Sequence, residues 1–139
     1  MKKIILTCGL SPGDIVMLTG AVRELHRCHP GEFITDVRTP CPALWEQNPY
    51  ITRLAEDDAG VEVEECHYPL IHVCNQAPYH FIHGFTQFFN ERLGTKIQPA
   101  LFKGDIHLSE EEQSWFSQVH ELVGREIPFW IIVAGGKQT

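Results

Sequence analysis

The chain has 139 residues, of which 43% are hydrophobic, and a formal net charge of −7 with its eight histidines counted as neutral. This hydrophobic content is typical of a globular domain and excludes an intrinsically disordered chain. Lysines and arginines form no dense block, which argues against a nucleic acid as partner. The five cysteines are odd in number and never spaced as CxxC, a pattern that favours free thiols over a disulfide framework.

The hydrophobic runs bear on the location of the protein. Lys2 and Lys3 precede an apolar run far shorter than the core of a signal peptide. No run approaches the roughly 20 residues that span a bilayer. We therefore expect a soluble, cytoplasmic protein.

The first part of the chain has the pattern of a strand, a glycine turn, a helix and a second strand. Residues 3–7, with an apolar centre at 4–6, predict a strand, and apolar residues recur at helical spacing over 15–25. A Pro-Gly pair at 30–31 ends the helix, and polarity alternates over 32–37 as in a strand. Such a unit predicts a parallel sheet with a right-handed crossover.

The middle of the chain is less regular. Residues 43–47 predict a short helix, and 51–54 predict a short strand. Alternating valine and glutamate over 61–64 predicts an exposed or edge strand, and 71–74 predicts a further short strand or an extended loop. A helix is then expected from Pro78 to about Leu93, with Gly94 as its end. Its apolar stripe consists of four phenylalanines: Phe81, Phe85, Phe88 and Phe89.

The last part of the chain predicts one helix and one strand. Ser109 and Glu112 have the spacing of a capping box that opens a helix to Gly124. Trp115 in this helix, like Trp45 earlier in the chain, is expected to be a packing residue. The continuous apolar run 129–134 is typical of a strand buried on both faces. The fold class is therefore α/β, a Rossmann-like, mainly parallel sheet with helices on both faces.

The junction between the first strand and the first helix carries the most suggestive chemistry. Ser11 and Asp14 have the spacing of a capping box, with Pro12 at the first helical position, and this explanation needs no function. A functional explanation is also open, because ligands of open α/β sheets bind at the carboxyl ends of the strands. There Gly9 and Gly13 would let a substrate approach the backbone, and Asp14 could accept a proton from an attacking alcohol.

Several short motifs match one family. They are Ile4-Ile5-Leu6, Gly13-Asp14-Ile15-Val16, Thr19, Ala21, Leu25, Pro30 and Asn48-Pro49-Tyr50-Ile51. Over Met1 to about Pro49 the chain resembles glycosyltransferase family 9, the heptosyltransferases of lipopolysaccharide biosynthesis and their relatives. The segment 74–85 looks like a subgroup of that family, and the remainder of the chain resembles it weakly.

The resemblance implies a GT-B fold, in which two Rossmann-like domains face a cleft. Residues 1–94 would be the N-terminal, acceptor-side domain and 95–124 a connecting loop and helix. Residues 125–139 would be the first strand and glycine loop of a truncated donor domain. A chain of this length is not expected to transfer sugar by itself, and its unfinished edge would favour self-association.

The resemblance also implies an activity. Asp14 would be the general base of an inverting transfer, with no metal and no cofactor. The partners would be a nucleotide-sugar donor such as ADP-heptose and a glycan or lipid-linked acceptor, which would allow peripheral association with the inner membrane. Gly135, Gly136 and Lys137 resemble the turn that approaches the donor phosphates.

Two histidines form a second candidate group. His80 and His83 lie one helical turn apart and could donate hydrogen bonds to sugar hydroxyls or anionic groups, or could be ordinary surface or packing residues. Asn75 could likewise bind a sugar or cap the helix. The expected substrate-binding residues are thus Gly9, Ser11, Gly13, Asn75, His80 and His83.

Other functions have weaker support. A metal site would need His80 and His83 together with His67, His72, Cys66 and Cys74, but their spacing matches no zinc pattern. The end of the chain lacks the GxxxxGK[ST] spacing of a P-loop. Cys8 is the least implausible nucleophile, because it lies near a helix N-terminus. A non-catalytic Rossmann-like module that binds a ligand or partner is the alternative to a transferase.

Overall fold

The computed structural model describes residues 1–69, 76, 78 and 80–132. The chain forms two compact units, Met1–His107 and Leu108–Thr139. The first unit includes residues 95–107, which follow the second long helix. The expected elements at 71–74 lie outside the described residues.

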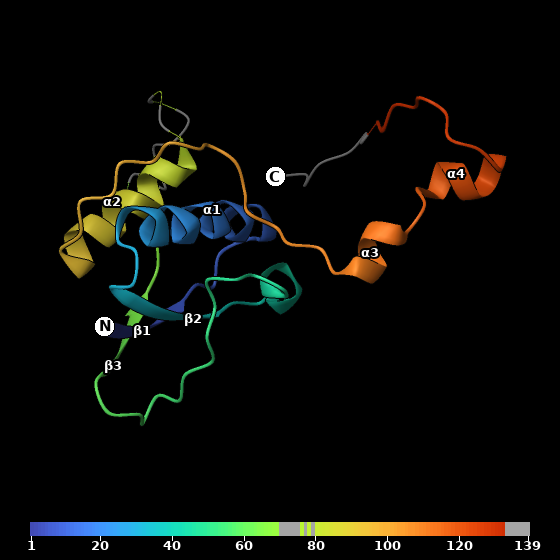
Figure 1. Cartoon of the computed structure of the whole chain (residues 1–139). Helices are drawn as coiled ribbons and strands as arrows, with labels where there is room; N and C mark the ends of the chain where they lie inside the picture. Colours follow the sequence, from blue (N-terminus) through green and yellow to red (C-terminus); the bar gives the residue numbers. More distant parts are fainter. Residues whose placement is uncertain (70–75, 77, 79, 133–139) are drawn as a thin grey trace. The chain divides into compact units, whose positions relative to one another are not determined.

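The first unit is built on a parallel sheet of three strands in the order β2-β1-β3 (Figure 1). The strands are β1 (Lys2–Thr7), β2 (Phe33–Arg38) and β3 (Val61–Glu65). The α/β class and the parallel sheet are therefore confirmed, as is the edge position of β3 among the described strands. The predicted strand at 51–54 is wrong, because Ile51 makes only an isolated parallel bridge to Thr35.

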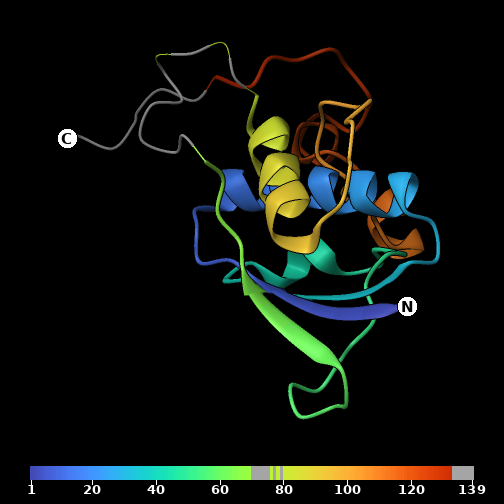
Figure 2. The ribbon, with the colours of Figure 1, turned by 90° about the vertical axis from the view of Figure 1, so that its left-hand side faces the viewer.

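Two long helices, α1 (Pro12–Cys28) and α2 (Phe81–Leu93), lie on the same face of the sheet (Figures 1 and 2). The sequence predicts helices on both faces of the sheet. The described residues place both long helices on one face only, so they do not show this arrangement. The connection from β2 to β3 contains only the short 3-10 helix η1 (Pro42–Trp45). On the opposite face the main chain at Leu54 covers part of β2, where its N–H donates to Asp36 Oδ2 at 3.3 Å.

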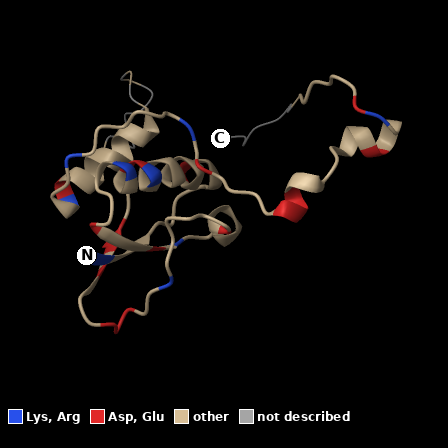
Figure 3. Ribbon diagram, viewed as in Figure 1, with Lys and Arg blue, Asp and Glu red and all other residues tan. Residues whose placement is uncertain are grey.

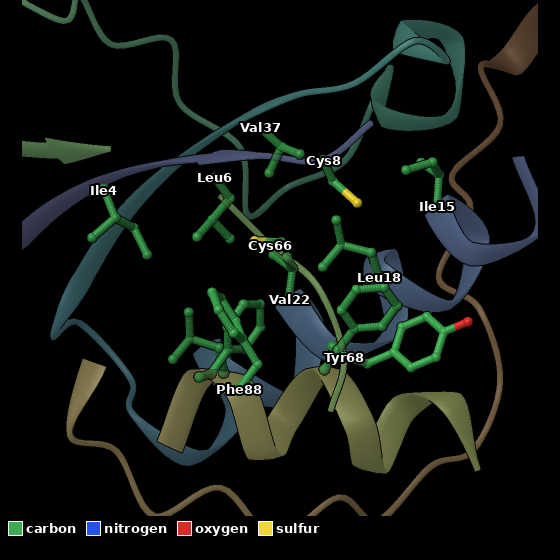
Figure 4. Packing of buried hydrophobic residues seen from close by; sticks show 14 of the residues in the cluster. Ile4, Leu6, Cys8, Ile15, Leu18, Val22, Val37, Cys66, Tyr68 and Phe88 are labelled. Carbon is green, nitrogen blue, oxygen red and sulfur yellow. The ribbon is translucent and has the colours of Figure 1, made fainter. Parts of the chain in front are cut away.

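The core lies between this sheet and the two helices (Figure 4). Ile4 and Leu6 of β1 and Leu18 of α1 are fully buried. The predicted aromatic stripe of α2 is confirmed, since Phe85 and Phe89 are also fully buried. Burying one such side chain contributes about 1.5–3 kcal/mol, so this interface supplies much of the stability of the unit.

The start of α2 differs from the prediction, and its end agrees. The helix begins at Phe81 rather than at Pro78, and His80 caps it because its Nδ1 accepts a hydrogen bond from Ile82 N at 3.2 Å. Gly94 ends the helix in the left-handed conformation, at φ 69°, where a residue without a Cβ is favoured.

The second unit contains α3 (Glu110–Ser114) and α4 (Gln118–Val123). The capping box of Ser109 and Glu112 is confirmed. The prediction of one continuous helix to Gly124 is wrong, because Trp115 is extended and the Ser117 hydroxyl starts a second helix by accepting from His120 N.

The aromatic and aliphatic residues of this unit are exposed. Trp115 is 65% exposed, so its predicted packing role is wrong, whereas Trp45 in the first unit is buried as predicted. No strand forms over residues 129–132, the described part of the predicted buried strand, and Trp130 is 94% exposed. A strand needs a neighbour for its backbone hydrogen bonds, and the described residues of this unit provide none.

None of the described helices has both the length and the apolar character needed to cross a bilayer.

Candidate functional site

The candidate site is the junction between the central strand β1 and helix α1. The sheet pairing continues one residue past β1, since Cys8 N donates to Arg38 O at 3.1 Å. The chain then turns and enters α1 at Pro12, with Ser11 as the N-cap residue. Asp14 therefore lies in the first turn of α1, at the carboxyl end of the central strand, where α/β sheets bind ligands.

The half-buried Asp14 carboxylate receives one hydroxyl hydrogen bond on each oxygen. Ser11 Oγ donates to Oδ2 at 2.6 Å, and Tyr68 Oη donates to Oδ1 at 3.2 Å. The predicted capping box is wrong, because the Ser11 hydroxyl makes no cap hydrogen bond to the backbone of the first turn. The two donors fix the orientation of the carboxylate, since a rotation would lose both bonds.

Tyr68 is a site residue that the sequence analysis missed. It follows β3, and the pairing of that strand extends to Cys66, whose N–H donates to Thr7 O at 2.7 Å. Tyr68, labelled in Figure 4, is only 4% exposed. Its ring packs edge-on against the rings of Phe81 and Phe85, with its centroid 5.4 Å from the first and 5.2 Å from the second. Its place just beyond the strand that neighbours β1 was the signal that could have identified it.

The two glycines of the junction lie in open space. A Cβ added to Gly9 or Gly13 would meet no atom within 4 Å, and both residues are exposed. Packing therefore does not require glycine at either position, and the backbone beside Asp14 is open to solvent.

His80 and His83 lie together, as their spacing predicts. Both rings contact the ring of Phe102, with centroids 5.1 and 4.8 Å from it. The described hydrogen bonds of the Asp14 carboxylate come from Ser11 and Tyr68. The remaining predicted site residues lie outside the described part of the chain: Asn75, Gly135, Gly136 and Lys137.

Neither the metal nor the thiol alternative gains support. In the described parts of the chain no three His, Cys, Asp or Glu side chains come close enough to hold a metal ion, and His72 and Cys74 lie outside those parts. Burial raises the pKa of the Cys8 thiol, and the nearby charges of Asp14 and Glu65 raise it further. Burial also raises the pKa of Cys66 well above its usual value. Both thiols are therefore held protonated, which disfavours a nucleophilic role.

Buried charged side chains on α1, which the sequence patterns did not predict, bind residues 95–107 along that helix. Glu24 is fully buried, and its Oε2 accepts hydrogen bonds from Ala100 N and from Arg27 Nε, both at 2.9 Å. Burial by itself would raise the pKa of Glu24, but the hydrogen bonds from Ala100, Arg27 and Arg23 outweigh it and hold the pKa below its usual value. Figure 3 shows the mixed charges along α1.

The same segment crosses α1 closely near its middle. Thr19 Oγ1 accepts a hydrogen bond from Asp105 N at 2.8 Å, and Arg23 Nη2 donates to Leu101 O at 2.9 Å. A Cβ on Gly20 would lie 2.6 Å from Lys103 O, so this approach requires a glycine. These contacts hold α1, and with it the turn that carries Asp14, in a fixed position within the first unit.

The first unit is thus a small α/β domain with a three-stranded parallel sheet and an oriented carboxylate at the carboxyl end of its central strand. No protein-family model matches the chain, and no curated protein or solved structure matches it significantly. The likeness to glycosyltransferase family 9 therefore depends on the sequence motifs.

Proposed function

We propose that the chain is the acceptor-side part of an inverting glycosyltransferase, with Asp14 as the general base. Asp14 would take the proton of an acceptor hydroxyl, whose oxygen would displace the nucleoside diphosphate from the anomeric carbon of a donor such as ADP-heptose. The observation that carries the proposal is the Asp14 carboxylate itself, oriented by Ser11 and Tyr68 at the carboxyl end of β1.

The hydrogen bonding of Asp14 leaves room for an acceptor. An ionised carboxylate has about four lone-pair sites, and the hydroxyls of Ser11 and Tyr68 occupy one on each oxygen. The other sites can accept a hydrogen bond from a sugar hydroxyl. The hydroxyl becomes strongly acidic only as its bond to carbon forms, so a weak base suffices at that stage.

The open position of Asp14 fits a site that another domain completes. Family 9 enzymes, which the motifs resemble, bind acceptor and donor on two domains that face a cleft. An acceptor-side base is then expected at an open surface of the first domain, as the exposed Gly9 and Gly13 beside Asp14 suggest. Cations and amides from the donor side would stabilise the charge that develops on the leaving diphosphate.

The test is a pair of isosteric substitutions in the complete protein. We expect Asp14→Asn to lower turnover by about 10²- to 10⁴-fold, the usual contribution of a general base, and to leave donor affinity unchanged. Asp57→Asn, in an exposed turn, is the control and should keep full turnover. Turnover is measured as ADP released from ADP-heptose in the presence of acceptor, and donor affinity by calorimetry.

Two outcomes would contradict the proposal. Near-normal turnover of Asp14→Asn would show that another group is the base. A folded complete protein that binds ligand and releases no nucleoside diphosphate from any donor would favour the non-catalytic binding module.

A further inference from the structure

A pocket lies at the same edge of the sheet as Asp14, one strand away from it. It has a volume of about 410 Å³ and lies beyond the carboxyl end of β2, where it is formed by the end of that strand, η1, the turn after η1, Ile51 and Arg53. Asp14 does not line it. The volume lies within the range of pockets that bind small molecules, about 300–1,000 Å³.

One wall of this β2 pocket is apolar and held in place. It includes Val37, Ile51 and the ring of Trp45, which is only 7% exposed. The Trp45 indole N–H donates to Thr39 Oγ1 at 3.2 Å, so the ring orientation is fixed. This wall can pack against the apolar body of a ligand without a change in the protein.

The turn that closes the β2 pocket has a strained backbone. Gln47, which lines it, has φ 58°, and it is the only described residue other than glycine with a positive φ. The strain is maintained by the hydrogen bond from Asn48 N to Trp45 O at 3.3 Å. A strained backbone conformation persists only where the surrounding structure holds it. Such conformations concentrate at sites that bind ligands.

Two arginines line the β2 pocket, and they differ in their bonding. Arg38 is held by an ion pair to Glu56 and by a hydrogen bond from Nη2 to Leu54 O at 2.8 Å. The Arg53 side chain is 81% exposed, and its ion contact to Asp36 Oδ1, at 3.8 Å, is longer than a hydrogen bond. Because no hydrogen bond joins Arg53 to Asp36, the guanidinium of Arg53 can turn toward a ligand without losing one to that carboxylate.

The Asp36 carboxylate does not compete strongly for Arg53. It is nearly fully buried, and its oxygens accept hydrogen bonds from Val37 N at 2.9 Å and Leu54 N at 3.3 Å. Arg38 Nε lies 3.5 Å from it. Asp36 is thus already compensated within the fold.

We propose that the β2 pocket binds a small organic acid with a single carboxylate. The planar fork of Arg53 would bind the carboxylate through two parallel hydrogen bonds, and the wall of Trp45 and Ile51 would hold the apolar body. The acidic residue Glu46 also lines the pocket, which disfavours a ligand with several negative charges. This site does not depend on the chemistry of Asp14.

The experiment is an NMR titration of the protein with three probes. Benzoate carries both a carboxylate and an apolar ring, benzamide carries the ring without the charge, and inorganic phosphate carries charge without the ring. We expect benzoate to shift the Trp45 indole N–H and the backbone amides of Thr39 and Gln47 in a saturable manner. Benzamide and phosphate should bind these residues at least about tenfold more weakly, because charge-assisted hydrogen bonds and apolar burial are both needed.

Substitutions at Arg53 provide the decisive comparison. Arg53→Gln should weaken benzoate binding by about tenfold, and Arg53→Lys by a smaller factor, because lysine keeps the charge without the planar fork. Lys96→Gln removes an exposed positive charge that does not line the pocket and is expected to leave the affinity unchanged. Since the Arg53 side chain is largely exposed, its replacement should not unfold the protein.

Each alternative result overturns the proposal. If none of the three probes shifts these signals in a saturable manner, the pocket does not bind such acids. Equal affinity for benzoate and benzamide would show that the carboxylate is not recognised, and tighter binding of phosphate would show that the ligand is an inorganic or polyvalent anion. Unchanged benzoate affinity in Arg53→Gln would show that Arg53 is not the anchor.

Discussion

Tyr68 donates a hydrogen bond to Asp14 across 54 residues of sequence, at 3.2 Å between Oη and Oδ1. The tyrosine is held by core rings of α2, whereas the aspartate belongs to the first turn of α1. This bond links the candidate catalytic carboxylate to the hydrophobic core. A carboxylate that is hydrogen-bonded to a side chain packed in the core is less free to reorient with the surface turn that carries it.

Replacing Tyr68 by phenylalanine tests this link, because it removes the hydroxyl and keeps the ring. We expect Tyr68→Phe to lower the free energy of unfolding by about 1 kcal/mol, the usual net value of a hydrogen bond, as measured by urea denaturation. In the complete protein we expect kcat to fall about tenfold, with an unchanged KM for the donor.

Tyr50→Phe is the matched control for that change. The Tyr50 ring stacks on His26 at 5.1 Å between centroids, and phenylalanine preserves this contact. If Tyr68→Phe behaves like Tyr50→Phe in both stability and rate, Tyr68 does not position Asp14. A loss of turnover in Asp14→Asn without any effect of Tyr68→Phe would leave the base in place and remove only its positioning residue.

Substitution by alanine should have different effects on stability at Gly20 and at Gly13, which both belong to α1. A Cβ at Gly20 would lie 2.6 Å from Lys103 O and 2.9 Å from Ile82 Cδ1, so Gly20→Ala should destabilise the protein by about 1–3 kcal/mol through overpacking. A Cβ at Gly13 meets no atom within 4 Å, so Gly13→Ala should be neutral or stabilising by up to about 1 kcal/mol. Thermal or urea unfolding of both variants measures the two effects. Equal destabilisation would contradict the close approach of residues 95–107 to α1.

The two units should differ sharply in their sensitivity to the loss of an aromatic side chain. Phe85 is fully buried, and Phe85→Ala should cost about 3–5 kcal/mol in the free energy of unfolding. Trp115 is 65% exposed, and Trp115→Ala should change that free energy by less than about 0.5 kcal/mol. Urea denaturation followed by circular dichroism measures both. A large cost at Trp115 would mean that its ring is covered in solution.

His26 should make the stability depend on pH near neutrality. Burial lowers the pKa of His26 below its ordinary value of 6.5, so the folded state favours the neutral ring. The unfolded state then binds more protons, and His26 contributes stability that is present above pH 6.5 and is lost as the pH falls through the folded pKa. The ring faces Thr35 Oγ1, 3.0 Å from Nε2, and the Tyr50 ring.

The measurement is urea denaturation of the parent protein and of His26→Gln between pH 7.5 and 5. Glutamine can still hydrogen bond to Thr35 and does not titrate, so we expect the difference in unfolding free energy between the two proteins to shrink as the pH falls. A difference that stays constant over this range would show that His26 is not buried in its neutral form.

Local patterns were sufficient for much of the first unit. The strand, turn, helix and strand that begin the chain, the aromatic stripe of α2, the end of α2 at Gly94 and the capping box at Ser109 were all predicted and confirmed. Each depends on residues within about four positions of one another, where hydrophobic periodicity and capping act directly. The placement of Asp14 at the carboxyl end of β1 followed from the same patterns.

Other features depended on contacts that no local pattern records. The helix expected to run to Gly124 ends early at Ser114, and Trp115 is exposed, because nothing in the described part of that unit buries its apolar side. The Ser11–Asp14 pair was predicted as a capping box, but Ser11 donates to the carboxylate and Tyr68 supplies the second donor. The β2 pocket was also not predicted, since it joins the end of a strand to a turn whose backbone conformation follows from packing.

The sequence by itself determined the strand, helix and strand that begin the first unit, the parallel sheet and the position of Asp14 in the first turn of a helix. Only the tertiary structure decided which groups surround that carboxylate, why Arg23 and Glu24 are buried on α1, and where the chain forms a pocket. The physical reason is the range of the interactions. Periodicity and capping act between near neighbours in the chain, whereas the partners of Asp14 and Glu24 are brought to them by the burial of apolar surface across the whole unit.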